Sequence, residues 1–208
     1  MMQILDFEQN SDDWLRARMG IPTSSRFHTV MAKGKEGGRS ITRTEYLHKL
    51  AGEIITGEPM ENFQNAHMER GHEQEAEARD MYAFMADIEP QRVGFVRDGN
   101  KGCSPDSLIG DDGGLEIKTC LPHIQIERLK LNRLPPEHRH QVQGNIWICR
   151  RQWWDFVSYC PKLPLLVVRV SRDDGFIATI DGAVTAFNAE LSETVEFIRN
   201  YGNRKEAA

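Results

Sequence analysis

The sequence has few of the features that mark secreted or membrane-spanning proteins. Its longest apolar stretch, residues 163–168, contains Pro164 and ends at Arg169, so it is far too short to cross a bilayer. The first residues include Asp6 and Glu8, and they lack the basic start and apolar run of a signal peptide. We therefore expect a cytoplasmic protein with no membrane attachment.

Cysteine is scarce and dispersed. No C-x-x-C pair occurs among the four cysteines, which are Cys103, Cys120, Cys149 and Cys160. Because no secretory context would oxidise them, we interpret them as reduced packing residues rather than a disulfide framework. Their spacing also disfavours an iron–sulfur cluster, whose thiolate ligands are usually clustered.

Low-complexity tracts and fixed-period repeats are absent as well. The hydrophobic fraction of 39% and the charged fraction of 27% are those of ordinary soluble proteins. A chain of 208 residues is long enough to bury a substantial core. We therefore predict one globular domain over residues 1–208.

Charge is unevenly distributed along the chain. The net charge of −5 argues against nonspecific affinity for nucleic acid. Residues 53–89 carry ten acidic side chains against Arg70 and Arg79, whereas residues 118–151 carry seven basic side chains against Glu127 and Glu137. Two interpretations stay open: two solvated helix surfaces, or a basic track on an acidic body.

Capping and turn signals predict a mixed α/β order of elements. Ser11 caps a short helix, Thr23–Ser25 open a second, and Thr42 with Glu45 forms a capping box for a helix that Gly57 ends. Further helices are expected over 65–87, 124–134, 137–150 and from Asp181 onward. Strands are expected over 92–97, 102–109, 115–119, 154–159, 165–171 and 176–180. This order predicts a mixed central sheet flanked by helices.

The helix predicted over residues 65–87 carries a carboxylate on its inward face. Steps of three and four residues place one set of side chains on a single face: Met68, Gly71, Glu75, Ala78, Tyr82 and Met85. A buried carboxylate is costly unless it is paired or binds a metal ion. Glu75 is therefore expected either to pair with a buried basic residue or to bind metal.

A second acidic pattern lies on the strand over residues 115–119. Alternation directs Leu115, Ile117 and Thr119 to one face, and Glu116 and Lys118 to the other. Ten residues earlier, Asp106 follows Pro105, which interrupts a strand at an edge or bulge. The spacing is Asp, a variable gap, then Glu-x-Lys.

Phosphodiester hydrolysis needs these kinds of residue. Carboxylates hold divalent ions that polarise the phosphoryl group, and a lysine opposes the negative charge that grows in the transition state. A surface strand that merely alternates Glu and Lys gives the same Glu-x-Lys spacing. The inward Glu75 upstream favours the hydrolytic interpretation.

An ordered set of motifs resembles a known family. The motifs are Trp14-x-x-x-Arg18-x-Gly20-x-x-Thr23-x-Ser25, Gly71-x-x-x-Glu75, Cys103-Ser104-Pro105-Asp106, Leu115-Glu116-Ile117-Lys118 and Gln141-Val142-Gln143. In this order they resemble the lambda exonuclease and YqaJ-type viral recombinase family of the PD-(D/E)XK nuclease superfamily. The resemblance runs from Trp14 to about Val170, and it implies a restriction-endonuclease-like core.

The resemblance implies a two-metal active site. Asp106 would bridge two Mg²⁺ ions, Glu116 and the backbone carbonyl of Ile117 would bind one, and Glu75 would bind the other. Lys118 would orient the attacking water or stabilise the transition state, and Gln141 would also lie at the active site. An all-oxygen ligand set suits Mg²⁺, with Mn²⁺ as a substitute.

The resemblance also implies contacts with the DNA end. The matching residues for the 5′-phosphate and nearby DNA are Arg18, Thr23, Ser25 and Ser104. Arginine supplies a forked cation, and a serine at a helix N-terminus adds donors, although solvated and capping roles stay open for Arg18 and Ser25. Met68 matches an apolar wedge between separating strands, or it is plain core. The residues flanking Gly71, Arg70 and His72, depart from the family pattern.

The implied activity is 5′→3′ digestion of linear double-stranded DNA to mononucleotides, which leaves a 3′ single strand. The resemblance further implies a ring-shaped homotrimer, a phage-type single-strand annealing protein as partner, and a bacterial or phage-infected cytoplasm. Two alternatives stay open. One is a structure-specific or restriction-type endonuclease, and the other is a non-catalytic DNA-binding recombination scaffold.

Overall fold

Two sheets covered by helices make up the computed structural model, which describes residues 1–34, 38, 40–60 and 66–201, without the side chains of 66–73. A three-stranded antiparallel sheet has the order β1 (Met2–Leu5), β2 (Phe95–Asp98), β3 (Lys101–Cys103). A mixed four-stranded sheet has the order β4 (Ser107–Ile109), β5 (Gly113–Thr119), β6 (Trp153–Tyr159), β7 (Leu166–Ser171). Only β5 and β6 pair in parallel in this second sheet.

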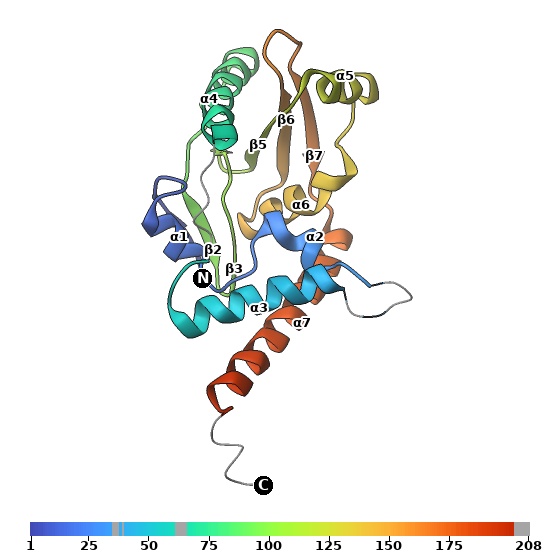
Figure 1. Cartoon of the computed structure of the whole chain (residues 1–208). Helices are drawn as coiled ribbons and strands as arrows, with labels where there is room; N and C mark the ends of the chain where they lie inside the picture. The colour runs from blue at the N-terminus through green and yellow to red at the C-terminus, as the bar shows by residue number, and fades with distance from the viewer. Residues whose placement is uncertain (35–37, 39, 61–65, 202–208) are drawn as a thin grey trace.

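Helices cover both faces of the mixed sheet. In chain order they are α1 (Asp12–Arg18), η1 (Ser24–Arg26), α2 (Phe27–Val30), α3 (Ile41–Thr56), α4 (Ala66–Ala86), α5 (Pro122–Leu131), η3 (Pro136–His138), α6 (Arg139–Ile148) and α7 (Asp174–Arg199). Figure 1 shows α4 and α5 at the two sides of the sheet, with α3 and α7 crossing below it. The predicted α/β architecture with a mixed sheet and flanking helices is confirmed.

Alternation of side chains along β6 explains why this strand contributes to two hydrophobic clusters, one on each face of the sheet. Val157 and Tyr159 pack with Ala78 and Tyr82 of α4. Side chains of opposite orientation, such as Phe156, join the larger core with α3, α6 and α7. Since successive side chains of a strand point to opposite faces, both faces of this strand are buried.

Local signals set several of the described helix ends, among them the start of α1 and the end of α3. Ser11 accepts a hydrogen bond from the Trp14 amide, as predicted for an N-cap, and Gly57 ends α3 with a positive φ of 74°. The predicted Thr42–Glu45 capping box is wrong. Ser40 caps α3 instead, because its hydroxyl reaches the Arg43 amide at 3.4 Å and the helix begins two residues earlier than predicted.

Two strand predictions need correction, and one strand was missed. Residues 176–180 form the first turns of α7 rather than a strand, because Asp173 caps that helix and Ile177 and Ile180 continue its buried stripe. Residues 102–109 form two strands in different sheets, β3 and β4. The N-terminal strand β1 was not predicted. It pairs with β2.

Solvent exposure corrects one residue of the predicted inward face of α4. Ala78 and Tyr82 are buried as predicted, but Met85 is 64% exposed, because the sheet no longer covers the last turn. The side chains of Met68 and Gly71 lie outside the described residues. Over the described part of the chain, none of the helices combines the length and apolar character needed to cross a membrane.

Candidate active site

Asp106 lies in the connection between the two sheets. Residues 104–106 leave β3 in the first sheet and enter β4 in the second. The Asp106 carboxylate accepts a hydrogen bond of 2.5 Å from the Ile117 amide of β5. In an extended strand the N–H and C=O of one residue point to the same edge, so the Ile117 carbonyl also faces the edge where Asp106 lies.

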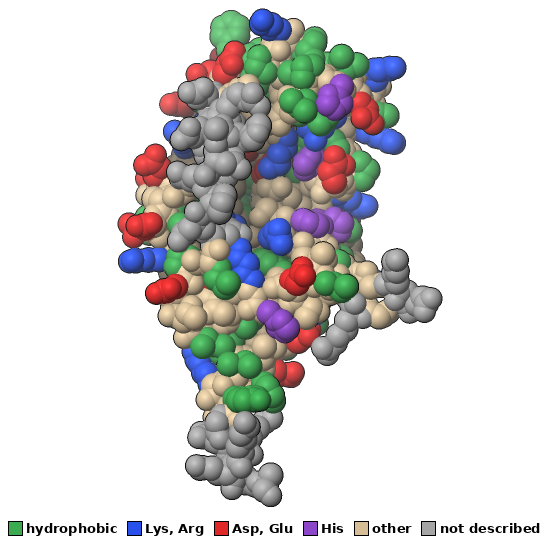
Figure 2. All heavy atoms as spheres, viewed as in Figure 1, with side chains coloured by type: hydrophobic (Ala, Val, Ile, Leu, Met, Phe, Trp, Pro, Cys, Tyr) green, Lys and Arg blue, Asp and Glu red, His purple; other side chains and the backbone are tan. Residues whose placement is uncertain are grey.

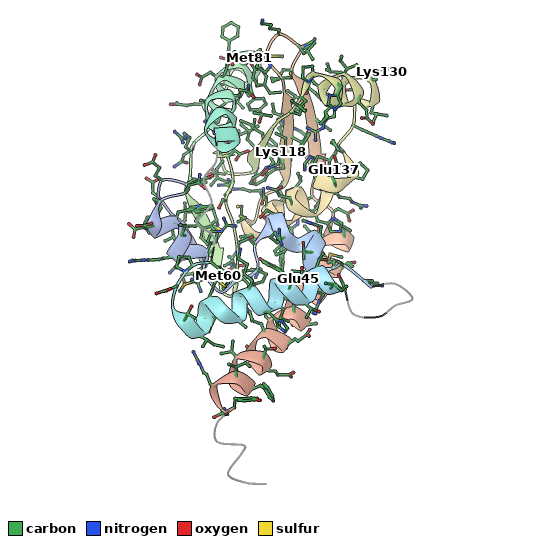
Figure 3. The ribbon with its side chains drawn as sticks, in the orientation of Figure 1. Glu45, Met60, Met81, Lys118, Lys130 and Glu137 are labelled. Carbon is green, nitrogen blue, oxygen red and sulfur yellow. The ribbon has the colours of Figure 1, made fainter. Side chains whose placement is uncertain are left out.

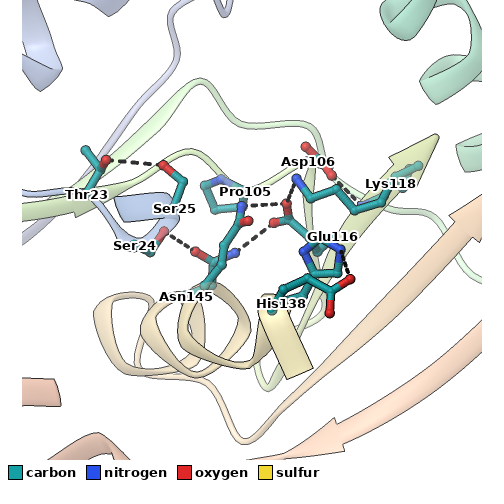
Figure 4. A network of polar contacts seen from close by, with 12 residues as sticks. Thr23, Ser24, Ser25, Pro105, Asp106, Glu116, Lys118, His138 and Asn145 are labelled. Atoms are coloured by element: carbon teal, nitrogen blue, oxygen red, sulfur yellow. Dashed lines mark hydrogen bonds and ion pairs between the residues drawn. The ribbon is translucent and has the colours of Figure 1, made fainter. Parts of the chain in front are cut away.

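Glu116 projects from β5 toward α6 and is 1% exposed. One carboxylate oxygen accepts from Gln141 Nε2 and pairs with Lys118 Nζ, both at 2.5 Å. The other oxygen accepts from Asn145 Nδ2 at 3.0 Å, as Figure 4 shows. A buried carboxylate without donors would be strongly destabilising, and these three donors offset that cost.

Lys118 supplies a positive charge next to both carboxylates. Burial by itself lowers the pKa of Lys118, but the nearby Glu116 and Asp106 carboxylates outweigh burial and raise it. The ammonium group is therefore charged at neutral pH. Figure 3 places Lys118 between α4 and the segment that carries Glu137.

Three carboxylates act on one another in this region. Burial raises the pKa of Asp106 well above its usual range, and the neighbouring Glu116 and Glu75 carboxylates raise it further. Such repulsion between oxygen donors is what a divalent cation would relieve, so the donor set fits Mg²⁺ or Mn²⁺.

Glu75 lies on α4 and pairs with a basic residue in this conformation. The Arg79 guanidinium, one helical turn away, bonds the Glu75 carboxylate and also donates to Ser107 Oγ at 3.2 Å. Among the described side chains, no three His, Cys, Asp or Glu residues converge as a complete metal-ion site. The sequence left two roles open for Glu75, an ion pair or a metal ligand. In this conformation Glu75 is paired with Arg79, and it also lies near Asp106, where a metal ligand would be needed.

A cleft connects Glu75 with Asp106. It has a volume of about 650 Å³, and its lining also includes Arg79, Arg92 and residues 6–10 of the N-terminal segment. The face drawn in Figure 2 has Lys, Arg and His side chains around a hollow near its middle, whereas the basic residues among the described lining of the cleft are the arginines Arg79 and Arg92. The structure thus brings the four predicted residues Glu75, Asp106, Glu116 and Lys118 into one region, together with Gln141.

The predicted DNA-end residues lie around β3. The Arg18 guanidinium stacks 4.1 Å from the centre of the Trp14 ring, and Trp14 Nε1 donates to Ser104 Oγ at 3.0 Å. Thr23 Oγ1 and Ser25 Oγ are 3.3 Å apart, and Thr23 forms a β-bridge with Gly102, two residues before Ser104. Trp14 therefore links Arg18 to Ser104, which follows β3. The hydroxyls of Thr23 and Ser25 lie beside the same strand. The predicted wedge residue Met68 lies outside the described side chains.

Three residues of the site were missed in the sequence. Asn145 and Ser24 extend the hydrogen bonds of Glu116, and Arg79 bonds Glu75. Asn145 follows Gln141 by four residues and Arg79 follows Glu75 by four, so each pair shares a helix face. That spacing could have identified Asn145 and Arg79, whereas the packing of Ser24 against α6 had no signal of its own.

The fold is that of the PD-(D/E)XK nuclease class, with a mixed sheet flanked by helices. The chain belongs to the YqaJ-like viral recombinase domain family, whose model matches residues 13–152. The family resemblance inferred from the motifs is therefore confirmed.

Solved structures extend the comparison. An alkaline exonuclease (LHK-Exo) from Laribacter hongkongensis is 34% identical, with a TM-score of 0.83 over 93% of this chain and 99% of that chain. The same exonuclease in complex with dAMP gives a TM-score of 0.84, with the same identity and coverage. A phage-related exonuclease from Haemophilus somnus 129PT shares the fold at 14% identity, with a TM-score of 0.64 over 86% of this chain and 96% of that chain. No curated protein sequence matches the chain.

Proposed function

We propose that the chain is a Mg²⁺-dependent DNA exonuclease that acts in recombination. It would digest one strand of linear double-stranded DNA in the 5′→3′ direction and leave a 3′ single strand. The observation that carries the proposal is the buried Glu116 carboxylate, held by Lys118 and Gln141 in the immediate surroundings of Asp106. The similar exonuclease with bound dAMP supports release of mononucleotides.

The proposed metal ligands are oxygen atoms that face one region. Asp106, Glu116 and the Ile117 carbonyl would hold one Mg²⁺ ion, and Asp106 with Glu75 would hold a second, with Mn²⁺ as a substitute. When bound, such ions supply Lewis-acid polarisation of the phosphate and a water of lowered pKa. Glu75 would have to leave Arg79 to serve as a ligand, and Arg79 would keep its bond to Ser107.

Lys118 and Gln141 have separate tasks in this proposal. The Lys118 ammonium, kept charged by Glu116 and Asp106, would stabilise negative charge that develops on the phosphate. Gln141 donates to the same Glu116 oxygen that Lys118 contacts, so it fixes the carboxylate while the lysine is engaged with substrate. The Glu116 part of the proposed site is thus organised before DNA arrives, whereas Glu75 would still have to leave Arg79.

Direction would come from recognition of the terminal phosphate. Arg18, Thr23, Ser25 and Ser104 would bind the 5′-phosphate, which carries more negative charge than an internal diester. A guanidinium can form a bidentate, charge-assisted contact with such a group. Because Arg18 lies over Trp14 and Trp14 bonds Ser104, the position of the guanidinium is coupled to β3, which leads to Asp106.

The family resemblance supports further parts of the proposal. We propose a single nuclease domain over residues 1–208, assembly as a homotrimeric ring around DNA, and a phage-type single-strand annealing protein as partner. The site of action would be the bacterial or phage-infected cytoplasm. A ring would let a chain with a net charge of −5 remain on DNA without strong nonspecific affinity.

Digestion of end-labelled DNA tests the activity. With Mg²⁺, linear duplex labelled at the 5′ end should release labelled mononucleotide early, duplex labelled at the 3′ end should keep its label, and closed circles should stay intact. Asp106→Ala should lose this activity. The matched control Asp111→Ala, an exposed aspartate in the turn before β5, should keep it.

Other outcomes would identify another function. Cutting of closed circles would indicate an endonuclease. Binding of DNA without hydrolysis in either Mg²⁺ or Mn²⁺ would indicate a scaffold. Early release of the 3′ label would contradict the proposed direction.

A further inference from the structure

Asn145 connects two parts of the molecule through its side-chain amide. It is fully buried on α6, where Oδ1 accepts from Ser24 Oγ at 2.6 Å and Nδ2 donates to Glu116 Oε2 at 3.0 Å. Figure 4 shows this continuous path from Ser24 through Asn145 to Glu116. An ionised carboxylate only accepts hydrogen bonds, so the partners determine which end of the amide faces which.

The path begins in the turn proposed to bind the DNA end. Ser24 is buried between Thr23 and Ser25, whose hydroxyls contact each other. A change in the backbone of this turn would move Ser24 Oγ, because all three residues belong to one short segment that precedes and begins η1. At its other end, the path reaches the Glu116 oxygen that Lys118 and Gln141 do not contact.

Gly144 makes the path possible. A Cβ atom built on Gly144 would lie 2.7 Å from the Phe27 ring and 3.0 Å from Ser24 Cβ. The missing side chain lets the η1 turn approach α6 closely enough for the Ser24 hydroxyl to reach Asn145. The bridge therefore depends on tight packing as well as on polar atoms.

We infer that Asn145 is a positioning residue that couples occupation of the Thr23–Ser25 turn by a 5′-phosphate to the orientation of the Glu116 carboxylate. The inference rests on the proposed function, because the turn and the carboxylate have those roles only in an end-directed nuclease. A coupling between two sites is reciprocal, so a change at Glu116 must also alter binding at the turn. This reciprocity gives a test that needs no catalysis.

The test is a binding cycle on short hairpin DNA in EDTA, measured by fluorescence anisotropy. The quantity is the ratio of Kd for a 5′-hydroxyl end to Kd for a 5′-phosphate end. Glu116→Gln should lower this ratio on the order of 5-fold in the wild-type background. It should leave the ratio unchanged in an Asn145→Leu background, since the path is already broken there.

Two further variants separate coupling from simple packing. Ser24→Ala should abolish the effect of Glu116→Gln on the Kd ratio, as Asn145→Leu does. If either single variant folds poorly, the double variant Ser24→Ala/Asn145→Leu removes both hydrogen-bond partners at once, so that neither is left buried without a partner. Gln143→Leu is the matched control. Gln143 is another buried amide of α6, but it bonds Ser171 and Asp173 instead, so Glu116→Gln should keep its effect in that background.

The inference is overturned if Glu116→Gln lowers the ratio equally with and without Asn145, or leaves it unchanged in the wild-type background. Digestion of linear DNA with Mg²⁺ is scored separately. A protein that shows the coupling in EDTA but no digestion would refute the nuclease proposal alone. A protein that digests from 5′ ends without coupling would refute only the role of Asn145.

Discussion

Replacing Gly144 with alanine tests the close approach between α6 and the η1 turn. Two effects oppose each other. Alanine is favoured over glycine inside a helix by about 1 kcal/mol. The added Cβ, however, would lie 2.7 Å from the Phe27 ring and 3.0 Å from Ser24 Cβ, and overpacking of this kind typically costs about 1–3 kcal/mol.

Gly182 provides the matched control. It lies inside α7, and a Cβ there would meet nothing within 4 Å. Gly182→Ala should therefore gain helix stability alone, by about 0.5–1 kcal/mol. The difference between the two variants isolates the packing effect, so Gly144→Ala should be less stable than Gly182→Ala by about 1–3 kcal/mol.

Urea unfolding followed by tryptophan fluorescence measures this difference. All samples should have the same protein concentration, because self-association would otherwise change the apparent stability. Similar m-values would show that the same surface is exposed in each case. If Gly144→Ala proves as stable as Gly182→Ala, the packing of η1 on α6 is looser than the structure indicates, and the Ser24–Asn145 bond is not set by this glycine.

Further predictions concern the proposed site. Asp106→Ala should lose Mn²⁺ binding in calorimetry as well as hydrolysis, and unchanged binding would remove Asp106 from the ligand set. Lys118→Ala should lower kcat on the order of 10²-fold with little loss of DNA affinity, and an equal loss of both would make Lys118 a phosphate anchor only. Arg18→Ala should slow cleavage from 5′-phosphate ends but not from 5′-hydroxyl ends, whereas equal slowing would indicate a general backbone contact. Burial, together with the charges of Lys118 and Arg128, lowers the pKa of His138 to about 4. The unfolded chain therefore binds more protons than the folded one, and the free energy of unfolding should fall as pH drops from about 6.5 to 4. In urea unfolding, His138→Gln should show a weaker dependence of this free energy on pH over the same range.

The sequence predicts elements well where the signal is local. Ser11 and Gly57 were correctly identified as a cap and a stop, because a hydroxyl before a helix and a left-handed residue after it act within one turn. The strand predicted over 176–180 was wrong because a short apolar run fits either period. These residues begin α7, where Ile177 and Ile180 are buried on the same helix face as Val184 and Phe187 in the later turns.

The site was predictable in kind but not in detail. Glu116 and Lys118 lie on one face of β5 as their alternation predicted, and the ordered motifs placed Asp106 near them. Two roles were left open for Glu75, an ion pair with an unspecified buried basic residue or a metal ligand, and Arg79 was not identified as the partner although it lies four residues further along the same helix. The bond between Ser24 and Asn145 joins residues 121 positions apart, and only tertiary packing brings them together.

The connection that carries Asp106 limits how the protein can be engineered. Residues 104–106 are the whole link between β3 and β4, which belong to separate sheets. One added residue would lengthen this link by about 3.3 Å and take the carboxylate away from the Ile117 amide. At the closed end of the β6–β7 hairpin, Lys162 is exposed and lies outside the paired residues 153–158 and 166–171, so an insertion at Lys162 changes no strand register. Epitope tags or fluorophore-bearing inserts therefore belong at Lys162 rather than at Pro164, whose carbonyl accepts a hydrogen bond from Gln125 Nε2 at 2.8 Å, and length changes near Asp106 are to be avoided.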